Sequence, residues 1–177
     1  MKVIFVLTVF LSVYCQSQNT VKYFAPSDTV YEECSICQID NVFFNLSGGG
    51  GVRPESYSEL DSVGAFIMKN PKIQFELGVH TDCRPISFTN DTLSLMRARS
   101  CVFYILEKNN NISNITYRGY GSKIPYTIME KDCERFQFFN VGDLLTKEYI
   151  DALENDEQKQ ISHQLNRRTE LRILRIE

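Results

Sequence analysis

The chain has 177 residues, of which 43% are hydrophobic and 23% are charged. This length is enough for one well-buried domain and too short for two large ones. The formal net charge is −3, so the chain has no overall positive field that would attract nucleic acid. The composition therefore argues against DNA or RNA as a partner.

The N-terminus has the pattern of an export signal. Met-Lys is followed by the apolar run 3–13, which is too short to span a bilayer and has the length of the hydrophobic core of a secretory signal. We predict that residues 1–17 are a signal peptide, cleaved before Gln18. Lipid attachment at Cys15 is the alternative, and the bulky Tyr14 before it disfavours that route. No later segment approaches membrane-spanning length, so no transmembrane segment is expected.

The first part of the exported chain is predicted to contain strands, a loop and a helix. Residues 18–34 are weakly periodic and are interpreted as an N-terminal extension that can contribute one strand. Residues 36–46 are rich in β-branched and aromatic side chains, which indicates a strand. The glycines that follow, 48–51, lack the Gly-Lys-Ser/Thr ending of a phosphate loop and predict a connector. A helix is then expected from Arg53-Pro54 to Asn70, with this apolar face: Leu60, Val63, Gly64 and Ile67.

The remaining elements alternate between strands and helices. Apolar residues at 73, 75 and 77 predict a half-buried strand that ends near Asp82. A helix is expected over 92–108, with a core stripe of Leu95, Ala98, Cys101, Val102 and Ile105. A strand over 112–119, an excursion with short helices over 146–153 and 156–165, and a final strand over 169–176 complete the chain. This order predicts an α/β sandwich, with one mixed sheet and helices packed on one face.

Five short motifs occur in order along the chain. They are His80-Thr81-Asp82; Asn90; Leu93-Ser94 with Arg97-Ala98; Gly119-Tyr120-Gly121 with Pro125; and Asn166-Arg167-Arg168. Together they resemble the signature of the OmpA/MotB C-terminal family. The resemblance covers residues 35–177 and implies a β-α-β-α-β-β fold. It also indicates an insertion at about 126–165, which is similar to a variant found in Bacteroidetes.

The resemblance implies non-covalent binding of peptidoglycan through the diaminopimelate of its stem peptide. The far end of that side chain carries an ammonium and a carboxylate, which suit one acid and one base. By position, Asp82 would take the ammonium and Arg97 would clamp the carboxylate bidentately. The other expected ligand-binding residues are Thr81, Asn90 and either Arg167 or Arg168. A structural ion pair between Asp82 and Arg97 is the alternative, and His80, Gly119 and Gly121 are assigned structural roles.

The cysteines carry two further hypotheses. Export would permit disulfides, and a bridge from Cys83 to Cys133 would clip the insertion over the site, leaving Cys34 and Cys37 to pair or to exchange partners. Cys101, on the helical stripe, is predicted to be a buried thiol. The Cys34-x-x-Cys37 spacing also raises a thiol oxidoreductase, but such a motif should open a helix, and here it leads into a strand.

The sequence therefore predicts a non-enzymatic periplasmic protein that links the outer membrane or envelope to the cell wall. It contains no nucleophile elbow and no metalloprotease motif, and no cofactor or metal is expected. Outer-membrane or envelope proteins that bind the N-terminal extension are further expected partners. The alternative is a scaffold that has lost peptidoglycan binding, because Val79 and Arg84-Pro85 stand where the family usually has glycine.

Overall fold

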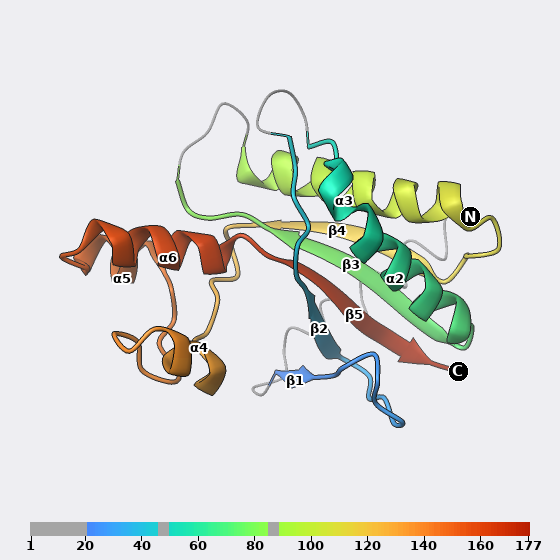
Figure 1. The fold of residues 1–177 in the computed structure, drawn as a ribbon, viewed down its shortest axis with the longest axis horizontal. Coiled ribbons are helices and arrows are strands. Elements are labelled where there is room, and N and C mark those ends of the chain that lie inside the picture. The colour runs from blue at the N-terminus through green and yellow to red at the C-terminus, as the bar shows by residue number, and fades with distance from the viewer. Residues whose placement is uncertain (1–20, 46–49, 85–88) are drawn as a thin grey trace.

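The computed structural model describes residues 21–45, 50–84 and 89–177 (Figure 1). The predicted signal peptide and the alternative lipidation site at Cys15 lie outside these residues. The elements follow in this order: β1 (Lys22–Tyr23), β2 (Ser35–Ile39), the 3₁₀ helix η1 (Pro54–Ser56), α2 (Tyr57–Lys69), β3 (Ile73–His80), α3 (Asn90–Lys108), β4 (Ile115–Gly121), α4 (Glu130–Arg135), α5 (Lys147–Ala152), α6 (Asp156–Asn166) and β5 (Thr169–Ile176).

The strands form one mixed sheet in the order β1-β2-β5-β3-β4. β3 and β4 are parallel and are joined through α3, as a crossover connection requires. β5, the last element of the chain, enters the centre of the sheet and runs antiparallel to both β2 and β3. The end of the chain is therefore needed to complete the sheet.

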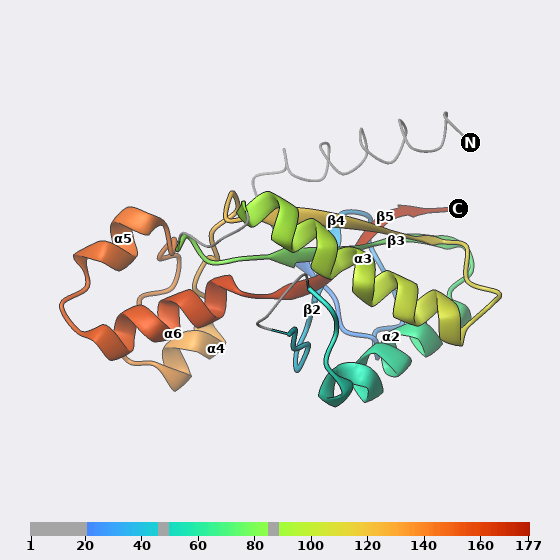
Figure 2. The ribbon, with the colours of Figure 1, turned by 90° about the horizontal axis from the view of Figure 1, so that it is seen from above.

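Helices α2 and α3 cover one face of this sheet (Figure 2). The apolar side chains between the helices and the sheet form the main core, and many of them are almost fully buried: Leu60, Ile67, Phe75, Leu77, Ala98, Cys101, Ile105 and Ile173. The expected α/β sandwich with helices packed on one face is confirmed. The predicted apolar face of α2 is also confirmed, since all four of its residues are buried.

The opposite face of the central strands carries buried polar side chains. Glu76 and His80 on β3 are 3% and 1% exposed, and Glu170 and Arg172 on β5 are buried beside them. The expectation of a half-buried β3 is therefore wrong. The alternation of apolar and polar residues predicts one buried face and one solvated face. Here hydrogen bonds and ion pairs satisfy the polar side chains, so the polar face is buried as well.

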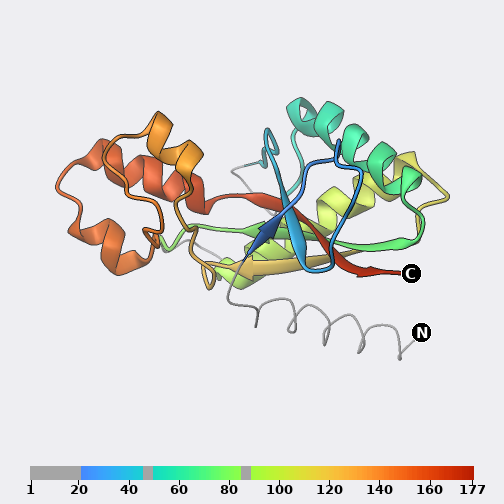
Figure 3. The ribbon, with the colours of Figure 1, turned by 90° about the horizontal axis from the view of Figure 1, so that it is seen from below.

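The segment after Pro125 forms a separate lobe with its own core, at one end of the sheet (Figures 1 and 3). Helices α5 and α6 were predicted, and α4 was not. The buried residues of this second core are Tyr126, Ile128, Phe139, Leu145 and Ile150. The base of the lobe is closed by Asn166, whose side-chain amide accepts from Tyr126 N at 2.8 Å and donates to Leu145 O at 2.8 Å.

Three details differ from the sequence-based expectations. β2 ends at Ile39 rather than at residue 46, because Asn41 adopts a positive φ of 55° and turns the chain. β4 begins at Ile115 and reaches Gly121. Leu95 is 47% exposed, and Ser94 holds the buried position on α3 because the helix lies too close to β4 there for a large side chain.

Neither expected disulfide is formed. Cys37, Cys83 and Cys133 are free thiols, which rules out the Cys34–Cys37 and Cys83–Cys133 pairings in this structure. Cys83 and Cys133 both pack against the second core, so they help to fill it as small apolar side chains. Cys101 is a buried free thiol, as predicted, and burial raises its pKa to about 12.

Within the described part of the chain, no helix is long and apolar enough to cross a membrane. The two-residue strand β1 pairs in parallel with β2, so the N-terminal extension contributes one strand, as expected.

Candidate ligand-binding site

Asp82 lies two residues beyond the end of β3 and is already paired. The carboxylate accepts from the main-chain N–H of Arg84 at 3.0 Å and from its guanidinium at 2.7 and 3.1 Å. The guanidinium of Arg167, from the end of α6, binds the same carboxylate. Among the described residues Asp82 forms no ion pair with Arg97, so the alternative of a structural Asp82–Arg97 pair is wrong.

The charge of Asp82 is maintained by these partners. Burial raises the pKa of the Asp82 carboxyl, and the hydrogen bonds from Arg84 and Arg167 outweigh that effect, so its pKa lies below the ordinary value of 3.8. The carboxylate is therefore ionised at neutral pH and is held in one orientation.

Asn90 and Thr81 support the loop that carries Asp82. The side-chain amide of Asn90 donates to the main-chain oxygen of Asp82 at 3.1 Å. The N–H of Thr81 donates to Gly121 O at 2.9 Å, and its buried hydroxyl oxygen has no hydrogen-bond partner among the described residues. In this structure Asn90 fixes the position of Asp82 rather than standing free to contact a ligand.

Arg97 is the unpaired member of the predicted site. It lies on the second turn of α3 with its guanidinium carbon 4.9 Å from the centre of the Phe44 ring. Its Nε is buried and has no hydrogen-bond partner within the described chain. Burial lowers the pKa of Arg97, and the nearby charge of Arg167 lowers it further. An anion that binds here would give the buried donor of Arg97 a charge-assisted hydrogen bond, which contributes more binding free energy than a bond to a donor that is already satisfied.

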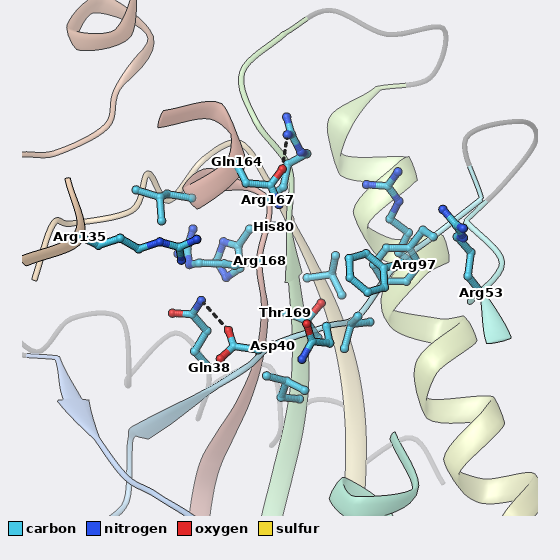
Figure 4. Close-up of a pocket in the computed structure, with 17 residues that line it drawn as sticks. Gln38, Asp40, Arg53, His80, Arg97, Arg135, Gln164, Arg167, Arg168 and Thr169 are labelled. Atoms are coloured by element: carbon cyan, nitrogen blue, oxygen red, sulfur yellow. Dashed lines mark hydrogen bonds between the residues drawn. The ribbon is translucent and has the colours of Figure 1, made fainter. Parts of the chain in front are cut away.

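Arg97 faces a pocket of about 670 Å³ at the junction of the sheet and the insertion (Figure 4). The wall consists of the loop after β2, the ends of β3 and β5, α3, and the last residues of α4 and α6. Its titratable lining residues, among those that the structure describes, are Arg53, Arg97, Arg135, Arg167 and Arg168, with His80 and one carboxylate, Asp40. The pocket therefore favours anionic groups. Asp82 does not line it, but its carboxylate pairs with Arg167, which does.

The two arginines of the Asn-Arg-Arg motif have different roles. Arg167 is partly exposed and binds Asp82. Arg168 is buried, donates to Glu170 at 2.7 Å and places its terminal nitrogens 3.3 Å from Ile124 O. Arg167 is therefore the one beside the candidate site. Arg168 also borders the pocket, but most of its donors are satisfied by the protein.

His80, for which a structural role was predicted, is buried and packed against its neighbours. Its ring stacks on Tyr120 with centroids 4.7 Å apart, and Nε2 lies 3.1 Å from the Glu170 carboxylate. Burial lowers the pKa of His80 to about 4, and the Glu170 charge opposes only part of that shift. The ring is therefore neutral at pH 7 and donates from Nε2. No cluster of three or more potential metal-ligating side chains occurs in residues 21–45, 50–84 and 89–177.

The two predicted structural glycines hold α3 against β4. A Cβ at Gly119 would lie 2.2 Å from Leu95 N, and Gly121 has a φ of 56° and donates from its N–H to Ser94 Oγ at 2.9 Å. This contact sets the height of the first turns of α3 above the sheet, and so it places Arg97 at the pocket.

Sequence reasoning did not identify four residues of the site. Arg84 was noted only as a departure from the family pattern, although its place two residues after Asp82 suits a local salt bridge. Phe44, Arg53 and Arg135 line the pocket and belong to no motif. Only the folded chain brings them together.

The protein is a mixed α/β domain with an arginine-lined pocket at one end of its sheet. Similar structures include the periplasmic domain of Helicobacter pylori MotB, with 13% identity, 78% of this chain and 73% of that chain covered, and a TM-score of 0.52. A second is the cell wall anchor of the T6SS from Pseudomonas aeruginosa, with 20% identity, 78% of both chains covered and a TM-score of 0.51. In sequence, neither a family model nor a curated protein matches the chain.

These likenesses establish the fold. The architecture expected from the five motifs, a mixed sheet with helices in the manner of MotB C-terminal domains, is confirmed. At 13% and 20% identity, what the chain binds has to be argued from its own residues.

Proposed function

We propose that this protein binds the peptide part of peptidoglycan non-covalently, without catalysis, and holds the bacterial envelope to the cell wall from the periplasm. The observation that carries the proposal is Arg97, a partly buried guanidinium that faces a large pocket and lacks an acidic partner among the described residues. The motifs around it and the fold shared with a cell wall anchor and a MotB periplasmic domain point to the same ligand.

The expected ligand group is the zwitterionic end of diaminopimelate. Arg97 would bind its carboxylate, and the ammonium would bind Asp82 beside the pocket. Since Asp82 is held by two arginines, the ammonium has to displace at least one of them. Arg84 is the candidate, because its side chain is 44% exposed and, among the described residues, contacts only Asp82 and, at 3.3 Å, Gln160 through polar groups.

Sedimentation with purified peptidoglycan tests the proposal. Arg97→Gln is expected to weaken binding by about tenfold or more, the effect of one lost charge-assisted contact. Arg99→Gln is the matched control, because Arg99 lies two residues along the same helix, also over an aromatic ring, and outside the pocket. Equal binding by the wild type and both variants, with unchanged melting temperatures, would refute the site.

Arg84 provides a second test. We expect Arg84→Ala to strengthen peptidoglycan binding by about fivefold, because the part-buried ion pair between Arg84 and Asp82 has to open before binding, and opening it from its exposed arginine end costs about 1 kcal/mol. The same sedimentation assay measures the change. Lys123→Ala, which removes the exposed pair with Asp91 outside the pocket, is the control and should leave binding unchanged. Weaker binding by Arg84→Ala would mean that Arg84 itself contacts the ligand.

One observation favours the alternative of a scaffold that no longer binds the cell wall: both charged partners of Asp82 come from the protein itself. If the wild-type chain fails to sediment with peptidoglycan and Arg84→Ala does not restore binding, the scaffold function is the better description. We further propose outer-membrane association and a Bacteroidetes-type source for the insertion, on the sequence features given above.

A further inference from the structure

The insertion adds positive charge to the pocket beyond the motif residues. Arg135 is the last residue of α4, and its side chain lies across the pocket from Arg97 (Figure 4). The two arginines come from different lobes, since Arg97 lies on a helix of the main body and Arg135 belongs to the insertion. The pocket is thus bounded by a cation on each side.

The pocket arginines differ in whether the protein neutralises them. Arg53 pairs with Glu55 at 2.6 Å, Arg167 with Asp82, and Arg168 with Glu170 at 2.7 Å. Within the described part of the chain, Arg97 and Arg135 form no ion pair. Asp40, which is the one carboxylate among the described lining residues, accepts from Gln38 at 3.3 Å. The pocket therefore presents two guanidiniums that are free to bind anions.

The position of Arg135 is set by the packing of the insertion. Asp132, in the same helix, accepts from Tyr126 Oη and from Met129 N, both at 2.9 Å. The guanidinium of Arg135 lies 5.0 Å from the ring centre of Phe136, which packs against the second core. The hydrogen bonds of Asp132 therefore fix the short helix, and the contact with Phe136 holds the guanidinium of Arg135 where it lines the pocket.

We propose that Arg135 forms a second carboxylate-binding position, so that the pocket selects a stem peptide with a free carboxylate in addition to the zwitterionic end of diaminopimelate. This inference rests on the proposed function and names the ligand more closely. The volume of about 670 Å³ suits a peptide segment rather than one terminal group. The glutamate that precedes diaminopimelate in the stem is joined through its side chain, so its α-carboxylate is free for Arg135.

The test compares two soluble tripeptides, alanyl-γ-glutamyl-diaminopimelate with the glutamate α-carboxylate either free or amidated. Calorimetry measures their binding to the whole chain, to Arg135→Gln and to the control Lys131→Gln, which changes an exposed residue of the same helix outside the pocket. Amidation is expected to weaken wild-type binding by about tenfold, and Arg135→Gln is expected to weaken binding of the free acid equally. The amidated peptide should bind the wild type and Arg135→Gln with the same affinity.

The outcomes separate this inference from the proposed function. If the tripeptide binds and Arg97→Gln abolishes binding, but Arg135→Gln binds both peptides as the wild type does, the second position is refuted and the peptidoglycan site stands. If amidation weakens binding to Arg135→Gln as much as it weakens binding to the wild type, the two changes act independently. That result would also refute the second position. If the wild type binds neither the tripeptide nor peptidoglycan, the proposed function itself fails.

Discussion

Glu170→Ala is expected to lower the free energy of unfolding by about 4 kcal/mol, the effect of removing one partner from a buried charge network. The Glu170 carboxylate binds Arg172 at 2.6 and 3.0 Å and Arg168 at 2.7 Å, and all three side chains are at least 93% buried. Without the carboxylate, two guanidiniums remain buried with no acid between them. Urea denaturation measures the change.

The matched control is Asp151→Ala, which removes the exposed pair with Lys147. Exposed pairs of this kind contribute about 0.5 kcal/mol or less, so a small change is expected. If both substitutions lowered stability by the same small amount, the buried network would not contribute to stability as argued. A fall in stability of the Glu170 variant with an unchanged m-value would support a loss within an intact fold.

The network also affects how stability depends on pH. Burial alone would raise the pKa of Glu170, but the interactions with His80, Arg168 and Arg172 outweigh it and hold the pKa well below 4.5. A lowered carboxyl pKa contributes stability that is present above pH 4.5 and is lost as the pH falls through the folded-state value. On acidification below pH 4.5, the free energy of unfolding should therefore fall less in the Glu170→Ala variant than in the wild type.

Gly119→Ala is expected to destabilise the protein by about 3 kcal/mol, because the new methyl group overpacks a backbone contact. Its Cβ would lie 2.2 Å from Leu95 N and 2.6 Å from Leu95 Cα, and neither atom can move without shifting α3. Since α3 carries Arg97, the same change should also weaken ligand binding. Thermal unfolding and the peptidoglycan assay measure the two effects.

Gly64→Ala in α2 is the control for this second prediction. Its Cβ would lie 2.8 Å from Asn109 Nδ2, the end of a side chain that can turn away at the loss of its hydrogen bond to Ile105 O, and alanine favours a helix over glycine by about 1 kcal/mol. A net change within about 1 kcal/mol is expected. Equal destabilisation by the two substitutions would contradict the close contact of α3 with β4.

Elements with a long apolar pattern were predictable. α2 and α3 lie where their periodicity places them, since each buries enough of one face to leave a repeated signal. β5 also has its predicted bounds, although both of its faces are buried. α4 was missed, because six residues are too few for a helical period to be recognised and its burial comes from the aromatic residues that follow it.

The candidate site, too, could be predicted only in part from the sequence. The motifs identified Asp82 and Arg97, and they also identified the glycines that hold α3 on the sheet. They did not show that Asp82 is paired with Arg84 and with Arg167, which is 85 residues away in the chain. The disulfide hypothesis failed for a related reason: two cysteines can pack around one core as free thiols, and spacing along the chain does not distinguish this from a bridge.

The class of fold, and one acid just after β3 with one base in the early turns of α3, could be predicted from the amino-acid sequence alone. Periodicity and short motifs are local properties, so they can be recognised without coordinates. Which charges neutralise each other depends on the folded chain, in which Arg97 and Arg135 line one pocket and form no ion pair with an acid of the described residues. Ion pairing depends on distance and burial, and the packing of the insertion against the sheet sets both.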